Sequence, residues 1–414
     1  MSDRRPWLTR NLKIVSAVSL LQDAASELLY PLLPILLTTV LGAPAAVVGA
    51  VEGIAEGVAA GTKVVAGRLS DRWRKVPLVG LGYGLAAVGK VLVAAATMWP
   101  VVLLGRSVDR LGKGIRGAPR DALLVVDIPP HQRGRAFGFH RAADTAGAVI
   151  GPLIALAGYE LLDHQLRPLL WVAVVPAVLS AALVFVLREP ARPADSVVEE
   201  RAPASVSKPP GPVVSRRARS SPSSTTDSKA LGHDFWRVVG ILGVFSLVNF
   251  PDALLLLRLH EIGFSVVEVI LAYVGYNLVY TLLSYPAGVV ADRLSAQQVV
   301  AVGLLVFAVA YAGLGLTTDH LAAWLLTAGY GAYTELTDGV GKAWVSGLLP
   351  AGSQGTGQGI FQGVLGGGIL VAGVWAGLAW GGDGQLPLVV AGSVAGLVGA
   401  GLLVVRLPAA QSRG

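Results

Sequence analysis

The chain has 414 residues, of which 53% are hydrophobic and 14% are charged, and its mean hydropathy is +0.63. This composition lies far outside that of soluble globular proteins. Its apolar runs are about 20 residues long, which is enough to cross a bilayer, and they are continuous rather than alternating, which excludes a transmembrane β-barrel. The sequence therefore predicts an all-α membrane protein.

The formal charge of +7 is concentrated on one side of the predicted membrane segments. Basic residues cluster within 4–13, 68–75 and 116–135, whereas the intervening loops at 42–46 and 98–100 carry no charge. By the positive-inside rule, both termini are expected in the cytoplasm of a multi-pass protein of the cell (inner) membrane. The basic balance is therefore a topology signal, and no nucleic-acid partner is expected. The absence of cysteine excludes disulfides, thiolate metal sites and cysteine nucleophiles.

Twelve apolar segments of membrane-spanning length follow one another along the chain. They lie at about 14–40, 46–68, 77–98, 100–118, 134–160, 168–187, 236–258, 265–290, 297–317, 321–348, 355–380 and 386–406. The predicted fold is two pseudo-symmetric six-helix bundles, 1–187 and 235–414. They are joined by a Pro-, Ser- and Arg-rich cytoplasmic linker at 188–234 that should be disordered. The linker is either a plain spacer or a regulatory segment.

The fourth segment breaks the apolar pattern with a series of charges. Its charged residues recur at steps of three and four and form one stripe of a helix: Arg106, Asp109, Arg110, Lys113, Arg116 and Arg120. A charge at the bilayer centre costs about 3 kcal/mol even on lenient insertion scales. The stripe must therefore face the protein interior and find partners there.

Other segments of the first half supply those partners. Its membrane acids are Asp23, Glu27, Glu52, Glu56, Asp109 and Asp144, and its bases are Lys63, Lys90, Arg106, Arg110, Lys113 and Arg141. The acids are interpreted either as proton carriers, because burial away from water favours the neutral carboxyl, or as permanent ion-pair partners. Asp23, Glu56 and Glu27 are the favoured carriers by depth. Arg106 and Arg141 either attract an anion or counter-ion or form structural ion pairs.

Two further clusters remain open to two interpretations. His140 and Asp144, four residues apart, fit a divalent-metal site with nitrogen and oxygen donors, or a hydrogen-bonded histidine. In the second half, six polar residues are expected to line a cavity or to form single interhelical hydrogen bonds: Asn249, Asp252, Tyr273, Tyr276, Asn277 and Gln362. Pro31 and Pro34 predict a kink in the first segment.

The second half repeats the charge pattern of the first. Gly288, Asp292 and Arg293 follow the eighth segment as Gly67, Asp71 and Arg72 follow the second. In the tenth segment, Glu335, Asp338 and Lys342 match Arg106, Asp109 and Lys113 position for position. An internal duplication is therefore predicted, and parallel repeats of this kind place the substrate site near the midplane between them.

These motifs resemble those of the major facilitator superfamily, over the whole chain outside the linker. The Gly67, Asp71 and Arg72 motif is similar to the loop signature after the second helix, which in the family is a cytoplasmic conformational latch. The fourth-helix signature is matched from Arg106 onward, with Asp109 in place of Gln and Arg110 in place of Gly. The string from 109 to 121 resembles that of a bacterial branch of the family.

The fifth-helix signature of the family is met by Gly147, Gly151 and Pro152, and in the family it accompanies export antiporters. A glycine packing face with a proline kink is the alternative explanation. The resemblance implies a secondary transporter that moves a small solute by alternating access, with proton-coupled export favoured. A divalent-metal carrier, an anion carrier and a non-transporting receptor or scaffold remain as alternatives.

No catalytic string and no nucleotide-binding loop are found, so neither enzymatic activity nor a cofactor is expected. The expected partners are a small-molecule or ion substrate, protons and the lipid bilayer, with a monomer as the default state. Replacing the carboxylate in Asp23→Asn or Glu56→Gln is expected to abolish coupled transport.

Overall fold

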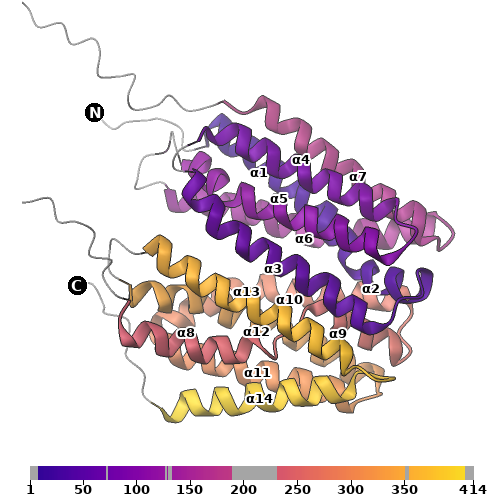
Figure 1. Cartoon of the computed structure of the whole chain (residues 1–414), viewed down its shortest axis with the longest axis vertical. Coiled ribbons are helices and arrows are strands. Elements are labelled where there is room, and N and C mark those ends of the chain that lie inside the picture. Colours follow the sequence, from indigo (N-terminus) through magenta and orange to yellow (C-terminus); the bar gives the residue numbers. More distant parts are fainter. Residues whose placement is uncertain are drawn as a thin grey trace, which may run out of the picture.

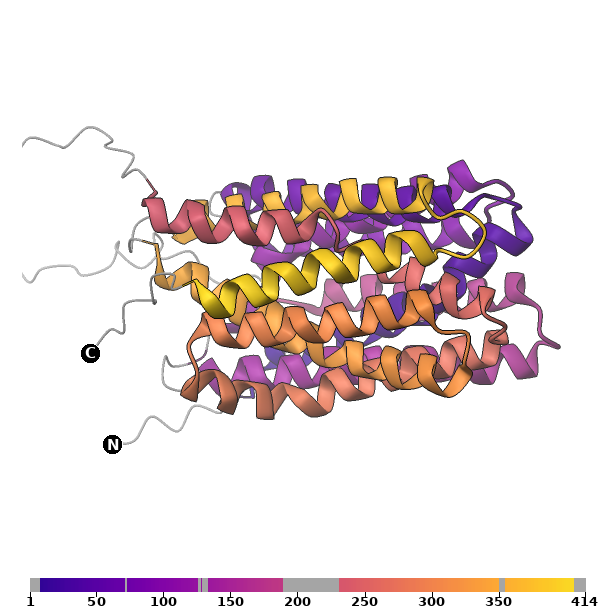
Figure 2. The same ribbon diagram turned by 90° about the horizontal axis from the view of Figure 1, so that it is seen from below.

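The computed structural model describes residues 8–70, 73–125, 128, 133–188, 231–349 and 354–405, and all regular elements within these ranges are helices. The helices run lengthwise between two ends of the molecule (Figures 1 and 2). They are α1 (Arg10–Leu29), α2 (Leu33–Ile35), α3 (Ala45–Ser70), α4 (Lys75–Ala94), α5 (Trp99–Val125), α6 (Arg133–Leu161), α7 (Leu166–Leu183), α8 (His233–Ser246), α9 (Asp252–Glu261), α10 (Val266–Arg293), α11 (Ala296–Leu316), α12 (His320–Gly347), α13 (Gln354–Leu378) and α14 (Gln385–Val404).

Nine helical segments in the described ranges are long and apolar enough to cross a membrane by length and composition. The other predicted crossings correspond to α5 and α12, which carry the charged motifs, and to α8 with α9, which are separate short helices. Helix α5 continues to Val125, seven residues beyond the predicted end at 118. The apolar run ends there, but the charged turns that follow remain helical, as the stripe through Arg120 predicts, and Arg120 finds polar partners within the protein.

The first crossing changes helix type at its two prolines. Helix α1 is followed by a 3-10 turn η1 (Tyr30–Leu32), the short α2 and a π-turn η2 (Leu36–Val40). Proline lacks an N–H and clashes with the carbonyl four residues earlier, so Pro31 and Pro34 interrupt the regular ladder. The kink predicted from the sequence is confirmed.

The seventh crossing differs from its prediction as one segment over 236–258, because it is divided between α8 and α9. Pro251 disfavours a helical conformation in the residue before it. Two carbonyls freed by the break are hydrogen-bonded by side chains: Trp375 Nε1 donates to Leu247 O at 2.7 Å, and Tyr311 Oη donates to Phe250 O at 3.3 Å. The break is therefore a satisfied part of the fold and brings Asp252 to the start of α9.

Helices of the first half pack mainly on one another, as do those of the second. Helix α1 packs on α6 and α7, α5 packs on α3 and α4, and α11 packs on α12 and α14. Contacts between the halves are made chiefly by α3 with α13 and α6 with α10 (Figure 1). Where α3 crosses α13, a Cβ on Gly49 would lie 2.1 Å from Gly373 O, so only glycine permits this approach.

The predicted boundaries at 187 and 235 stay a prediction. Helix α8 begins at His233, and residues 189–230 of the predicted linker lie outside the described part of the chain.

Candidate functional site

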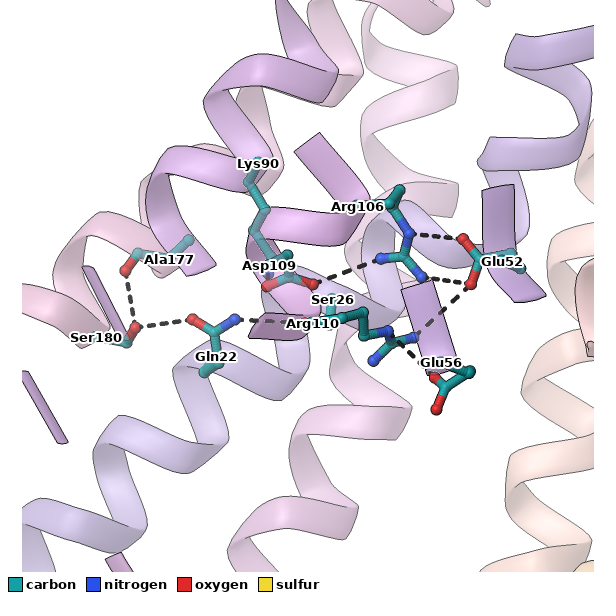
Figure 3. A network of polar contacts seen from close by, with 10 residues as sticks. All are labelled: Gln22, Ser26, Glu52, Glu56, Lys90, Arg106, Asp109, Arg110, Ala177 and Ser180. Atoms are coloured by element: carbon teal, nitrogen blue, oxygen red, sulfur yellow. Dashed lines mark hydrogen bonds and ion pairs between the residues drawn. The ribbon is translucent and has the colours of Figure 1, made fainter. Parts of the chain in front are cut away.

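The most deeply buried charges join α3, α4 and α5. Arg106 donates from Nε to Glu52 Oε1 at 2.6 Å and from Nη2 to Glu52 Oε2 at 2.7 Å, a bidentate pair in which both residues are 1% exposed (Figure 3). Two parallel hydrogen bonds of this kind fix both the position and the orientation of the guanidinium group. It sets the rotation of α5 against α3.

Two more acids and two more bases extend this cluster (Figure 3). Arg110 Nε lies 3.2 Å from Glu56 Oε1, and Lys90 Nζ donates to Asp109 Oδ1 at 3.0 Å. Arg106 Nη1 also lies 3.6 Å from Asp109 Oδ2. We call Glu52, Glu56, Lys90, Arg106, Asp109 and Arg110 the paired network. Its three acids balance its three bases, as a buried charge cluster requires.

Glycines allow α4 and α5 to approach closely enough for these pairs. A Cβ on Gly112 would lie 2.3 Å from Gly82 O, and one on Gly89 would lie 2.5 Å from Gly105 O. The backbones therefore touch directly, in the manner of small-residue contacts in membranes. The glycine of the fourth-helix motif thus has a packing role.

A second group of predicted residues lines a cavity of about 680 Å³ between the halves. We call it the basic cavity because its lining holds six cations and four acids: Lys63, Lys113, Arg116, Arg120, Arg141 and Lys342, with Asp23, Glu27, Asp121 and Asp144. Asp121 lies four residues before the end of α5 and Lys63 seven before the end of α3, at the end of the molecule where α1 begins. The cavity thus extends toward that end.

Asp23 of α1 and Asp144 of α6 lie within hydrogen-bonding reach of each other in the basic cavity. Arg120 Nη1 is 3.9 Å from Asp144 Oδ2, and His140 Nε2 is 3.7 Å from it. Asp144 Oδ1 is buried and meets no hydrogen-bond donor among the described residues. Two carboxylates this close cannot both be charged at low cost, so the geometry suits one shared proton.

Two charged side chains of the cavity wall, one acid and one base, connect the halves. Glu27 of α1 accepts a short hydrogen bond from Tyr273 Oη of α10. Arg141 of α6 donates to Tyr280 Oη at 2.8 Å and lies 4.0 Å from Glu335 of α12. These contacts depend on how the two halves are placed, so they are candidates for contacts that break when the halves move.

A third group lines a separate cavity of about 330 Å³, which we call the aromatic cavity. Asn249, Asp252, Asp338 and Lys342 are predicted residues in its wall. Tyr330 Oη donates to Asp252 Oδ1 at 2.7 Å, whereas Asp338 is neutralised by Lys342 at 2.6 Å. Glu56 and Lys63 belong to its wall as well. Lys63 and Lys342 line both this cavity and the basic cavity.

The structure does not bring every predicted residue to a cavity. Asn277 donates to Tyr273 O of its own helix at 3.0 Å. His140 and Asp144 are near each other, but no group of three metal-ligating side chains occurs among the described residues. The hydrogen-bonding interpretation of His140 is favoured by Ser16 Oγ, 3.5 Å from its Nδ1.

The predicted latch falls largely outside the described residues. Asp71 and Arg72 lie outside them entirely. Gly67 lies in the last turn of α3, and Gly288, Asp292 and Arg293 belong to the last turns of α10, whose side chains are not described. The latch therefore remains a prediction.

The predicted hinge residues of α6 lie against α1. A Cβ on Gly147 would lie 2.6 Å from Leu20 O, and one on Gly151 would lie 2.5 Å from Ala24 O, with Pro152 inside the helix. These glycines hold α6 close enough to α1 for Asp23 and Asp144 to meet.

Sequence reasoning missed several residues of these sites. Lys90 was expected among the paired bases of the first half, but its partner Asp109 was not identified, because a single lysine in an apolar segment does not show which helix it faces. Tyr330 and Tyr333, which line the aromatic cavity, were also missed. Their three-residue spacing, matched by Tyr273 and Tyr276, is a signal that could have found them.

A multi-helix membrane protein with paired charges inside and polar cavities between two halves has the architecture of a solute carrier. A sequence model of the Major Facilitator Superfamily matches residues 15–259. The chain is 28% identical over 380 residues to an uncharacterised MFS-type transporter of Methanocaldococcus jannaschii, covering 90% of this chain and 89% of that protein. It is 34% identical over 152 residues, 37% of each chain, to the multidrug resistance protein MdtH of Photorhabdus laumondii subsp. laumondii.

Solved structures show the same fold. A bacterial homologue of the human lysosomal transporter Spinster, in an inward-facing and unoccupied conformation, superposes with a TM-score of 0.68 at 16% identity, over 97% of this chain and 95% of that one. The chain belongs to the major facilitator superfamily. It is a multi-pass membrane transporter of small molecules rather than an enzyme, as the sequence motifs predict.

Proposed function

We propose that the chain exports a small solute from the cytoplasm in exchange for protons, by alternating access. The carrying observation is the Asp23 and Asp144 pair, two acids within hydrogen-bonding reach inside the basic cavity. A shared proton can be added or removed there at the expense of a single long and partly exposed ion pair, Arg120 with Asp144 at 3.9 Å. The pair is therefore a better proton carrier than an acid held by a cation at short range.

The acids of the paired network serve a different role in this proposal. Glu52 is held bidentately by Arg106, and Glu56 lies 3.2 Å from Arg110. Protonating either would leave a buried guanidinium without its counter-charge, which costs several kcal/mol. We therefore assign a structural, stabilising role to Glu52 and Glu56, and likewise to Asp109 and Lys90.

Loading the proton changes which arrangement of the halves is favoured. A proton on the pair lowers the negative charge beside Arg120 and Arg141, which line the same cavity. Arg141 and Glu27 each contact the second half, through Tyr280 and Tyr273 respectively. A ligand shifts a conformational equilibrium only by its differential affinity for the two states, and these contacts are where that difference arises. One charge crossing 100 mV supplies about 2.3 kcal/mol, roughly a fiftyfold bias.

Export is supported by two similarities. Gly147, Gly151 and Pro152 resemble the signature of export antiporters, and part of the chain is similar to a multidrug resistance protein. We place both termini in the cytoplasm and the protein in the inner membrane as a monomer, because the basic loops lie on the terminal side and one chain contains both halves.

The test is flux in proteoliposomes with an imposed pH gradient and an internal pH dye. Lipophilic cations, organic anions and divalent metals are offered in turn. We expect substrate-dependent proton movement opposite to that of the solute. Solute flux without proton movement would contradict the coupling, and flux of no solute would favour the receptor alternative.

An anion carrier is the second candidate. It is favoured by the six cations against four acids in the basic cavity, which leave a formal excess of two positive charges. In the same assay, uptake of an organic or inorganic anion, with no uptake of lipophilic cations, would select it. The metal alternative has less support, because the described residues offer no three-ligand cluster.

A further inference from the structure

The aromatic cavity has an unusual combination of walls. Seven aromatic rings line it, from α8, α10, α12 and α13, from the break between α8 and α9, and from η1: Tyr30, Phe245, Phe250, Tyr276, Tyr330, Tyr333 and Phe361. Its volume of about 330 Å³ falls in the range of small-molecule pockets. Apolar cavities of this kind take ligands with a large hydrophobic body.

The tyrosines in its wall are stacked in one direction. Tyr276 and Tyr330 have centroids 5.4 Å apart with planes 19° from parallel, and Tyr330 and Tyr333 are 5.3 Å apart at 22°. In a stacked series the outer faces of the end rings stay free, these faces carry the negative part of the ring quadrupole, and cations bind them. The wall therefore suits a ligand that is both aromatic and positively charged.

One carboxylate in this wall lacks a balancing cation. Asp252 accepts a hydrogen bond from Tyr330, but no ion pair joins it to any Lys, Arg or His of the described residues. The other two acids of the wall are paired, Glu56 with Arg110 and Asp338 with Lys342. Asp252 therefore supplies the negative charge available to a ligand in this cavity.

A cation of the wall could compete for Asp252 only if it were close. Of the two lysines in the wall, Lys342 is paired with Asp338, which leaves Lys63. Lys63 lies two helical turns, about 10 Å, beyond Glu56 toward the C-terminal end of α3. It also lines the basic cavity. Asp252 instead begins α9, beyond the helix break.

We propose that the aromatic cavity binds a lipophilic aromatic cation, held by the tyrosine faces and by Asp252 as its counter-charge. This rests on the proposed transport function and names the substrate class for it. The proton pair and the solute site are then separate: the first lies between α1 and α6, and the second is built mainly by α8 to α13.

The test uses two probes of nearly equal size and shape but opposite charge, tetraphenylphosphonium and tetraphenylborate. Binding is measured at equilibrium on the full-length protein in nanodiscs, where no transport is needed. We expect tetraphenylphosphonium to bind at least tenfold more tightly than tetraphenylborate, after subtraction of binding to empty nanodiscs. Equal affinity for the two probes, or preference for the anion, would overturn the proposal.

A variant then assigns the selectivity to one residue. Asp252→Asn keeps the size of the side chain and removes its charge, so it should weaken tetraphenylphosphonium at least tenfold and leave tetraphenylborate unchanged or tighter. Glu160→Gln is the control, because Glu160 is an exposed acid at the end of α6 that lines neither cavity. Unchanged cation binding in folded Asp252→Asn protein would contradict the assignment, and if that variant does not fold, the comparison of the two probes still decides.

Binding and transport can fail separately. Cation-selective binding without proton-linked flux would leave this inference standing and refute the proposed coupling. Proton-linked flux of another solute, with no charge selectivity in binding, would do the reverse.

Discussion

Helices α5 and α12 each carry an aspartate and, four residues later, a lysine at equivalent positions of the predicted repeat, yet they place the aspartate differently. Asp109 of α5 is bonded to Lys90 of α4, with side chains 5% and 2% exposed. Its counterpart Asp338 of α12 is paired with Lys342 one turn along the same helix, and these side chains are 54% and 42% exposed. The same spacing therefore ties helices together in one half and forms a solvated cavity wall in the other.

The largest expected effect comes from neutralising the two aspartates in turn. Asp109→Asn leaves Lys90 and Arg106 buried with one acid too few, so the free energy of unfolding should fall by about 3–5 kcal/mol. Asp338→Asn breaks an exposed pair and should cost less than about 1 kcal/mol. Denaturant titration in mixed micelles measures both, and equal losses would remove the distinction between the helices.

A buried cation of the second half is held by hydrogen bonds to backbone carbonyls. Arg258 of α9 is 4% exposed and donates to Leu314 O at 3.1 Å, Gly315 O at 3.3 Å, Thr317 O at 3.1 Å and Asp383 O at 2.6 Å. Three of these carbonyls lie at the end of α11, where no helical partner exists.

Replacing this arginine should therefore destabilise the second half. Arg258→Met keeps the apolar stem but leaves those carbonyls without donors, so we expect a loss of about 3 kcal/mol. The same titration measures it, with Arg237→Met of the exposed α8 surface as the control. A loss no larger than that of the control would show that water replaces the guanidinium.

A smaller effect should follow from loosening the contact between the halves. Tyr273→Phe removes the hydrogen bond to Glu27 that joins the halves in the observed arrangement. A loss of about 1 kcal/mol from this arrangement lowers its population relative to the alternative roughly fivefold. Because the chain has no cysteine, a single Ala148→Cys in the basic cavity reports access by its labelling rate. When a thiol reagent is added on the side of the membrane where the termini lie, we expect the protein that also carries Tyr273→Phe to be labelled more slowly than the one with Ala148→Cys alone. Tyr159→Phe is the control, and an unchanged rate would mean that the contact does not bias the halves.

How far the sequence leads can be judged from particular residues. The charge stripe of α5 was predictable, because steps of three and four must share a helix face and that face must be buried. The kink at Pro31 and Pro34 followed from proline geometry. The partner of Asp109 was not predictable, since Lys63 of α3 and Lys90 of α4 were both available and the choice depends on how these two helices rotate. The division at Pro251 was missed although Asn249, Pro251 and Asp252 interrupt the apolar run there, because the runs on either side together have the length of one membrane crossing.

The roles of individual acids need three-dimensional contacts. Asp23, Glu27, Glu52 and Glu56 look alike in the sequence, as acids in apolar segments. In the structure, Glu52 and Glu56 face guanidinium groups, Glu27 faces a tyrosine, and Asp23 faces another acid. This sorting separates structural charges from the proposed proton carriers.

The most direct test of proton coupling compares two modes of transport in one variant. Asp23→Asn protein in proteoliposomes is assayed for solute accumulation driven by a pH gradient and for exchange of labelled for unlabelled solute without a gradient, with the solute that the flux panel identifies. Our account predicts that gradient-driven accumulation is lost while exchange remains within about threefold of the unmodified protein, as expected when a proton site is removed but alternation persists. Accumulation at the unmodified level would contradict the central role of the Asp23 and Asp144 pair.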